Sequence, residues 1–268
     1  MGGGGLFTDA ETLKAPYIWA KQISVLIRNQ TPYIFYGQSF GPLKSMWSRY
    51  WAKKAAKHAK AILVRDESSK KQLEAWGLKV SLGTDLAFSW LIEEQQKRPK
   101  QEEILALILR EWPKIGLNQW KQWSKPINEY AKKRHLKVIL MTMEPQQKKE
   151  LENLKKLDWE LYIPSSAREV LFALQKAKQS IVMRLHGGIF AVVAGKPSLI
   201  LSYSQKVEAF FTSLYGRKTK QILSPVEWSE SDLRHALKEL DLKTDSTLNL
   251  EEKIQLNRDF LASHLNSL

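Results

Sequence analysis

The 268-residue sequence lacks cysteine altogether. Disulfides, thiolate metal sites and a cysteine nucleophile are therefore excluded, and the composition suits a cytoplasmic setting. No apolar run approaches about 18 residues, so we expect no transmembrane helix, and the N-terminus lacks the charged-then-apolar order of a signal peptide. The five histidines are scattered without the spacing of metal ligands, so we expect no metal site.

Acidic residues are scarce: 28 of them stand against 42 lysines and arginines, which gives a net charge of +14. A lysine-rich surface explains such an excess, but so does an anionic partner, such as a phosphorylated metabolite, a nucleotide or lipid diphosphate, or a membrane surface. The ten tryptophans are scattered rather than arranged as a stacking platform, so we expect no nucleic acid partner. A peripheral membrane contact by the basic segment 45–60 stays open, although such helices are usually only solvated.

Short apolar runs alternate with helical patterns along the chain, which predicts parallel sheets with crossover helices. The first series occupies residues 1–92, and the polar, proline-containing stretch 93–103 is the expected linker. A second series occupies residues 103–225, and residues 226–268 are expected to form C-terminal helices. The sequence therefore predicts the α/β class with two Rossmann-like lobes. Strands are expected at 32–36, 61–64, 80–82, 104–109, 137–141, 161–163, 181–183 and 197–201, and helices at 15–28, 45–60, 117–134, 146–157, 167–176, 189–194, 207–214, 230–240 and 250–265. A further helix is expected to begin at a cap formed by Asp66 or Ser68 and to end at Trp76, before Gly77.

The most distinctive stretch is S-I-V-M-R-L-H-G-G-I-F, residues 180–190. Its apolar run predicts a buried strand, and we expect Arg184, His186, Gly187 and Gly188 in the loop at the strand's carboxyl end, where open α/β sheets bind ligands. Glycine lets a ligand approach the backbone, arginine offers a fork suited to phosphate or carboxylate, and histidine transfers protons near neutral pH. The pattern favours an anion site with acid–base chemistry. The alternative is an ion-paired Arg184 and a half-buried His186.

Other loops at the ends of expected strands also carry glycine or arginine. They are residues 2–9, 37–42, 65–69 and 110–113. Together with residues 184–188, we expect these loops to converge on a crevice between the two lobes. The glycines at 2–5 fit either a loop between a strand and a helix or a flexible tail.

Taken together, these segments resemble the polysaccharide pyruvyl transferase family. The motifs that carry the resemblance are G-G-G-G-L-F-T-D at 2–9, Y-G-Q-S-F-G-P-L at 36–43, V-R-D-E-S-S at 64–69, G-T-D-L-A-F at 83–88, L-R-E-W-P at 109–113, M-R-L-H-G-G-I-F at 183–190 and K-P-S-L-I-L-S-Y at 196–203. The resemblance implies two Rossmann-like lobes similar to those of the two-lobed, GT-B-like glycosyltransferases.

The resemblance also implies an activity. Family members transfer the pyruvyl group of phosphoenolpyruvate to two hydroxyls of a sugar as a cyclic ketal and release phosphate, in the synthesis of cell-surface polysaccharide such as cell wall. Phosphoenolpyruvate is the donor substrate, so no cofactor is implied. The acceptor sugar is expected to be lipid- or nucleotide-linked and the enzyme cytoplasmic. A lipid-linked acceptor would bring it to the inner face of the membrane.

The sequence departs from the family's pattern in two places. Family members carry strands and helices before the glycine loop, so we expect an N-terminal lobe without those upstream elements. After the strand at 137–141 the family usually reads Q-x-x-D, whereas this chain reads E-P-Q-Q-K-K from Glu144. We therefore expect the family's acidic residue to be absent there, with a lysine in its place.

We hypothesise a role for each candidate residue. His186 is expected to be the general acid, and Arg184 and Arg65 are expected to hold the carboxylate and phosphate of the donor, assisted by the N–H groups of Gly187 and Gly188. Arg110 is expected to hold the phosphate or an acceptor diphosphate. The other candidate substrate-binding residues are Gly4, Gly5, Gln38, Asp85 and Lys206.

Several polar residues have two interpretations. Asp9 or Asp85 is either the base for a sugar hydroxyl or a helix or loop cap, and Asp66 is expected to be structural. His58 and His135 lie in or beside basic helices, so we expect both to be solvated.

Two other functions fit the same segments. A two-lobed glycosyltransferase that uses a nucleotide sugar would bind a nucleoside diphosphate at the same helix N-terminus. A truncated, non-catalytic family member would bind a glycan or another partner.

Overall fold

The computed structural model describes residues 1–10, 12–94, 99–113, 115–215, 222–223, 229–240 and 250–265. The chain forms two compact units: unit 1 holds Met1–Ser89 and Asn249–Leu268, and unit 2 holds Trp90–Leu248. Each unit contains a sheet of parallel strands joined by helices, so the predicted α/β class is confirmed. Within the described part, no helix is long and apolar enough to cross a bilayer.

The units divide the chain differently from the predicted lobes, 1–92 and 103–225 with C-terminal helices at 226–268. Helix α10 (Glu230–Glu239) buries Leu233 and Leu237 in the core of unit 2, whereas α11 (Leu250–Leu265) belongs to unit 1. The two C-terminal helices are thus shared between the units because each covers apolar side chains of a different sheet. Part of the expected linker 93–103 lies outside the described residues.

Unit 1 contains a three-stranded sheet in the order β1-β2-β3, formed by β1 (Ile34–Gln38), β2 (Ala61–Val64) and β3 (Ser81–Leu82). The rings of Phe7, Phe35 and Phe40 contact one another at the centre of its core, with centroids 5.0–5.7 Å apart. Around the sheet lie α1 (Ala15–Arg28), α2 (Met46–Lys57) and α3 (Glu67–Glu74). Helices α2 and α3 begin where Ser45 and Asp66 provide side-chain caps.

The glycine segment at the N-terminus lies alongside β1. Tyr36 donates its N–H to the carbonyl of Met1, and Gly3 donates to the carbonyl of Tyr36, both at 2.9 Å. Gly2 and Tyr36 therefore form a parallel bridge. Of the two interpretations of this segment, the flexible tail is wrong, because the backbone is held at the edge of the sheet.

Helix α11 is fixed to unit 1 by one buried amide. The side chain of Asn257 donates to the carbonyl of Thr84 at 3.1 Å and accepts the N–H of Thr84 at 3.0 Å. Gly83 has no side chain at the point where the Asn257 amide approaches, so the amide reaches the backbone. Phe260 completes the contact by packing against Ile34 and Leu63.

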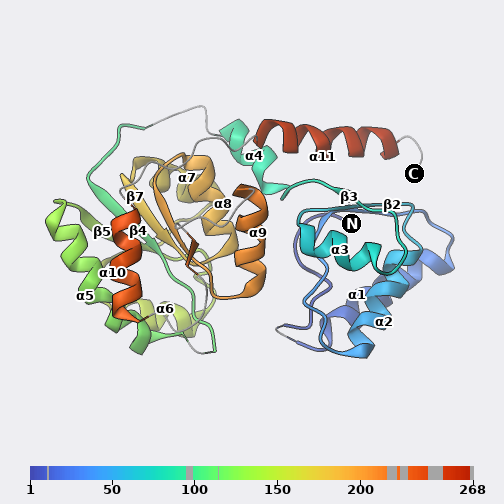
Figure 1. Ribbon diagram of the computed structural model, residues 1–268, viewed down its shortest axis with the longest axis horizontal. Coiled ribbons are helices and arrows are strands. Elements are labelled where there is room, and N and C mark those ends of the chain that lie inside the picture. The colour runs from blue at the N-terminus through green and yellow to red at the C-terminus, as the bar shows by residue number, and fades with distance from the viewer. Residues whose placement is uncertain are drawn as a thin grey trace. The chain divides into compact units, whose positions relative to one another are not determined.

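Unit 2 contains a six-stranded parallel sheet in the order β6-β5-β4-β7-β8-β9. Its central strands β5, β4 and β7 are labelled in Figure 1. Its strands are β4 (Ile104–Ile108), β5 (Lys137–Met141), β6 (Glu160–Tyr162), β7 (Gln179–Val182), β8 (Ser198–Leu201) and β9 (Ile222–Leu223). The chain builds outward from β4 to β6, then returns to the other side of β4 and builds outward again from β7. The point where the order reverses therefore lies between β4 and β7.

Helices cover both faces of this sheet. One face of β4 carries Leu105 and Leu107, which share a core with Leu109, the residue after the strand, and with α5 (Leu117–Lys133) and α10. These two helices run side by side (Figure 1). The other face carries Ile108, which faces α8 (Leu185–Ala194). Helix α8 in turn packs on α7 (Ala167–Lys176). The remaining helices are α4 (Ala87–Glu94), which the sequence did not predict, α6 (Lys148–Leu154) and α9 (Gln205–Tyr215).

Candidate functional site

The carboxyl ends of β4 and β7 flank the reversal of strand order in unit 2. In open α/β sheets this position is where ligands bind. The segment after β4 carries Arg110, and the segment after β7 carries Arg184 and His186. The two strands are hydrogen-bonded neighbours, and the N–H of Met183 donates to the carbonyl of Ile108 at 2.8 Å. The candidate residues of unit 2 therefore lie at one edge of one sheet.

Arg184 is the buried centre of this edge, with only 4% of its surface exposed. Its Nη1 lies 2.8 Å from Oε1 of Glu144, and its Nη2 lies 2.5 Å from Oε1 of Glu150. The second carboxylate oxygen of Glu150 accepts the N–H of Glu111 at 2.8 Å. The guanidinium therefore joins the ends of β4, β5 and β7, and its two Nη groups are both engaged with carboxylates.

The two carboxylate partners of Arg184 were missed in the sequence. The segment E-P-Q-Q-K-K after β5 was expected to lack the family's acidic residue, yet its first residue, Glu144, and the residue that follows the segment, Glu150, supply two carboxylates. Glu150 is 1% exposed, so this glutamate lies in the core although it sits on a polar helix. The signal that could have identified it is its place in the first turn of α6, a short helix that follows a site strand.

His186 lies in the first turn of α8, and its side chain is exposed. The sequence predicted a loop for residues 184–188 and a helix only from 189, whereas α8 begins at Leu185 with Arg184 as its N-cap. The first N–H groups of a helix have no partner inside it, and they mark the positive end of its dipole. The structure therefore places an exposed imidazole beside the donors of a helix N-terminus.

The two glycines of the motif serve packing. A Cβ at Gly187 would meet Ile108 at 3.3 Å, and a Cβ at Gly188 would overlap the ring of Phe211, whose Cε2 lies 2.8 Å away. The N–H of Gly188 donates to the carbonyl of Arg184 at 2.9 Å, inside the helix. The expectation that this N–H assists a ligand is therefore wrong, because the first helical hydrogen bond already uses it.

Gly188→Ala tests this packing role. The overlap with Phe211 is expected to cost about 1–3 kcal/mol, whereas alanine in place of a helical glycine would otherwise gain about 1 kcal/mol. We therefore expect a net loss of stability in urea unfolding, and a smaller loss when Phe211→Leu is the background, because the shorter side chain gives way. A Gly188→Ala protein more stable than the parent would contradict the close approach.

Arg110 is held among aromatic rings. Its Nη1 donates to the hydroxyl of Tyr203 at 2.9 Å, and its guanidinium carbon lies 4.9 Å from the ring centroid of Tyr203 and 5.1 Å from that of Trp112. The two rings are 4.7 Å apart. Tyr203 follows β8, so this half-buried cation is oriented by residues from the carboxyl ends of two strands.

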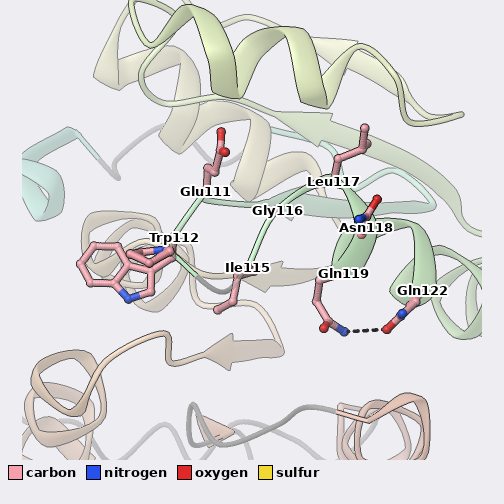
Figure 2. Close-up of a pocket in the computed structure, with 9 residues that line it drawn as sticks. Glu111, Trp112, Ile115, Gly116, Leu117, Asn118, Gln119 and Gln122 are labelled. Atoms are coloured by element: carbon pink, nitrogen blue, oxygen red, sulfur yellow. Dashed lines mark hydrogen bonds between the residues drawn. The ribbon is translucent and has the colours of Figure 1, made fainter.

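A pocket of about 370 Å³ opens between the segment after β4 and the first turns of α5. Trp112 stands at one end of the pocket and Gln122 at the other, where its amide accepts from Gln119 at 3.4 Å (Figure 2). The lining is rich in amides and has one large ring, and the same ring contacts Arg110. The lining residues are Glu111, Trp112, Pro113, Ile115, Gly116, Leu117, Asn118, Gln119 and Gln122.

Unit 1 also gathers its candidate residues at the carboxyl edge of its sheet. Arg65, which follows β2, is 5% exposed; it pairs with the carboxylate of Asp85 and donates from Nε to the hydroxyl of Ser39 at 2.7 Å. That hydroxyl donates in turn to Asp66 at 2.5 Å. Asp66 also caps α3 by accepting the N–H of Ser69, so its structural interpretation is confirmed.

Gln38 at the end of β1 connects this edge to the glycine segment. Its amide donates to the carbonyl of Gly3 at 2.5 Å, and Ser39 donates its N–H to the carbonyl of Gly4 at 2.9 Å. Gly4 has a positive φ of 80°, a conformation that favours glycine, and Gly5 follows it in a partly buried position. The structure thus brings Gln38 and the glycines together beside β1.

Asp9 is a cap. Its carboxylate accepts the N–H of Lys44 at 2.8 Å and that of Ser45 at 2.8 Å, just before α2. Burial raises the pKa of Asp9, but these hydrogen bonds outweigh burial and leave the pKa below its ordinary value of 3.8. Of its two interpretations, the cap is therefore confirmed, because a carboxylate held in this way is a weak base.

Asp9→Ala is expected to lower the free energy of unfolding by about 1–2 kcal/mol at pH 7, since two N–H groups lose their acceptor. A lowered folded-state pKa means that this contribution is present above pH 3.8 and is lost as the pH falls through the folded-state value. Urea unfolding of both proteins at several pH values measures the difference. A gap of unchanged size at pH 3 would contradict the role of the ionised carboxylate.

Lys206, His58 and His135 do not belong to either of these two sheet edges. Lys206 falls in the first turn of α9, and its side chain lies outside the described residues. His58 is the exposed C-cap residue of α2, and His135 is exposed after α5, so the prediction that both are solvated is confirmed. In the described ranges, no three His, Cys, Asp or Glu side chains are grouped to hold a metal ion.

Comparison with known proteins identifies the relatives of this chain. The sequence model of the family described as polysaccharide pyruvyl transferase matches residues 1–205. No curated protein sequence matches the chain. The UDP-GlcNAc 2-epimerase of Methanocaldococcus jannaschii, solved with UDP-GlcNAc and UDP, superposes with a TM-score of 0.61 at 11% identity, covering 93% of this chain and 81% of that one.

Two further structures are similar to the same extent. The UDP-N-acetylglucosamine 2-epimerase of Rickettsia bellii gives a TM-score of 0.60 at 13% identity over 96% of this chain and 80% of that one. The α,α-trehalose 6-phosphate synthase of Burkholderia multivorans gives a TM-score of 0.56 at 12% identity, over 95% of this chain and 75% of that one. At such identities the likeness concerns the fold alone, and it confirms the prediction of a GT-B-like fold with two Rossmann-like lobes.

Proposed function

Because this chain belongs to the polysaccharide pyruvyl transferase family, we propose that it transfers the pyruvyl group of phosphoenolpyruvate to two hydroxyls of a sugar as a cyclic ketal. The observation that carries the proposal is the place of the R-L-H motif. Arg184 and His186 stand where the strand order of unit 2 reverses, within the matched region. This is the edge at which the fold class binds anionic ligands.

The reaction forms two C–O bonds and breaks one. A proton added to the methylene carbon of phosphoenolpyruvate leaves a cation at the neighbouring carbon, which the first sugar hydroxyl attacks. The second hydroxyl then displaces phosphate from the same carbon. The two protons lost by the hydroxyls balance one gained by the methyl group and one gained by the departing phosphate.

His186 fits the role of general acid in this scheme. Its imidazole is exposed at the N-terminal turn of α8, beside N–H groups that suit the phosphate and carboxylate of the donor. His186 is therefore the residue that we assign to proton transfer.

Arg184 fits a positioning role better than a direct clamp. Both of its Nη groups are engaged with Glu144 and Glu150, and its side chain is buried. By joining the ends of three strands, it sets where α8 begins and so where His186 stands. Arg110 is the cation that we assign to the donor phosphate or to an acceptor diphosphate, since two aromatic rings and a tyrosine hydroxyl fix its orientation.

The pocket beside Trp112 suits the acceptor sugar. Amide side chains such as Asn118 and Gln119 both donate and accept hydrogen bonds, as sugar hydroxyls require, and the indole offers a flat apolar face. Trp112 contacts Arg110, so a sugar in this pocket would lie next to the residue that we assign to phosphate. At the carboxyl edge of unit 1, Gln38, Arg65 and Asp85 with the glycines 4 and 5 stay candidates for binding, and so does Lys206.

The proposal is tested by supplying phosphoenolpyruvate with a nucleotide- or lipid-linked sugar and measuring phosphate release together with the mass of the product. We expect phosphate release that depends on the sugar, and a product heavier by one ketal-linked pyruvyl group. A thermal-shift comparison of phosphoenolpyruvate with a nucleoside diphosphate distinguishes the alternatives. Stabilisation by the diphosphate alone, without phosphate release, would favour a nucleotide-sugar glycosyltransferase and overturn the proposal.

A further inference from the structure

Helices α1 and α2 of unit 1 expose a continuous group of apolar and basic side chains. The two helices lie side by side (Figure 1). At the start of α2, Met46 is 82% exposed and Trp47 is 74% exposed, which is unusual for two large apolar side chains in succession. We call this surface the aromatic–basic patch. It comprises Tyr17, Ile18, Lys21 and Val25 of α1 and Met46, Trp47, Tyr50, Trp51, Lys53, Lys54 and Lys57 of α2.

The aromatic rings of the patch form a chain across both helices. Trp47 contacts Tyr50, Tyr50 contacts Trp51, and Trp51 contacts Tyr17 of α1, with centroids 6.5, 5.1 and 5.2 Å apart. Lys54 stands over the Trp51 ring at 5.5 Å, and Lys21 stands over the Tyr17 ring at 5.9 Å. Rings and ammonium groups are thus interleaved on one surface.

The charge of the patch has a single sign. Neither α1 (APYIWAKQISVLIR) nor α2 (MWSRYWAKKAAK) contains an aspartate or glutamate. The exposed basic residues of the two helices are Lys21, Arg28, Arg49, Lys53, Lys54 and Lys57. The opposite face of α2 is buried and small, with Ala52, Ala55 and Ala56 packed in the core. Trp51 packs partly against the same core, whereas Met46, Trp47, Tyr50 and the lysines of the patch are exposed.

We infer that the aromatic–basic patch docks unit 1 on a bilayer surface with anionic headgroups. Tryptophan and tyrosine are the residues that gather at the membrane interface, and nearby lysines attract anionic lipids. The exposed apolar side chains of Ile18, Val25 and Met46 distinguish this surface from a nucleic acid site. Such a site binds bases and phosphates through aromatic and basic side chains and does not need these apolar side chains. The inference goes beyond the proposed function and does not rest on it.

Co-sedimentation of the full chain with vesicles tests the inference. We expect binding to phosphatidylcholine vesicles that contain about 30% phosphatidylglycerol, weaker binding to phosphatidylcholine alone, and release as salt is raised. The double variant Met46→Ser/Trp47→Ala should lower the partition coefficient roughly tenfold. Lys53→Gln/Lys54→Gln should lower it roughly 25-fold, because each removed charge is worth roughly fivefold.

Matched variants on unit 2 provide the control. Phe172→Ala removes an exposed ring that also has a lysine over it, and Lys132→Gln/Lys133→Gln removes two neighbouring exposed charges. Each is expected to leave the partition coefficient within about twofold of the parent. Failure of the parent chain to bind the anionic vesicles would overturn the inference, and so would equal losses in patch and control variants. If the parent chain bound an oligonucleotide but not the vesicles, and the patch variants lost that binding, the patch would be assigned to nucleic acid instead.

Discussion

Alanine in place of His186 is expected to lower kcat for phosphate release from phosphoenolpyruvate by roughly 10²–10⁴-fold. The reason is that the first step places a proton on a carbon atom, for which water is a poor donor at neutral pH. The imidazole is exposed in the first turn of α8, so its loss should leave the unfolding midpoint unchanged. Stopped assays of phosphate at saturating donor and acceptor measure the effect.

His235→Ala is the matched control, because His235 is also an exposed helical histidine of unit 2 and lies on α10. Its activity should stay within about twofold of the parent. His186→Gln retains a polar side chain of similar length but transfers no proton, so it should be as inactive as alanine. If His186→Ala kept full turnover, or if His235→Ala lost as much, the assignment of proton transfer to His186 would be wrong.

The place of the site could be predicted from the sequence, because it depends on local patterns. An apolar run followed by R-L-H-G-G indicates the carboxyl end of a strand, and the structure puts Arg184 there, at the reversal of strand order. The partners of Arg184 could not be predicted. Glu144 and Glu150 lie 40 and 34 positions earlier, and only the pairing of β4 with β5 and β7 brings them to it.

The start of α8 was misjudged for a related reason. Two adjacent glycines indicate a loop when propensity alone is considered. Here Gly188 lies inside the helix, and the position holds a glycine because Phe211 of α9 occupies the space where a side chain would be. A contact between two separate helices cannot be predicted from the local sequence. The return of α11 to unit 1 is another long-range contact. It depends on Asn257 reaching Thr84, 173 positions away.

Arg184→Met is expected to lower the free energy of unfolding of unit 2 by about 3–5 kcal/mol, out of a total of about 5–15 kcal/mol for a typical domain. Methionine fills most of the arginine's volume, so the loss comes mainly from charge. It leaves Glu150, 1% exposed, with an unpaired carboxylate in the core. Glu144 should contribute less, since its side chain is 33% exposed and water can solvate it. Urea unfolding followed by tryptophan fluorescence measures the change, since Trp120 and Trp123 are buried in the core of unit 2.

The double variant Arg184→Met/Glu150→Gln decides whether charge is the cause. Glutamine removes the stranded charge but keeps an oxygen that can accept the N–H of Glu111, now 2.8 Å from the carboxylate. We therefore expect the double variant to be more stable than Arg184→Met by at least about 1 kcal/mol, although it carries one more substitution. In Glu150→Gln alone, the arginine keeps Glu144, so its loss should be smaller than that of Arg184→Met. Simple addition of the two losses would mean that Arg184 stabilises the edge by packing, and His186 would then owe its position to the shape of the side chain rather than to the ion pairs.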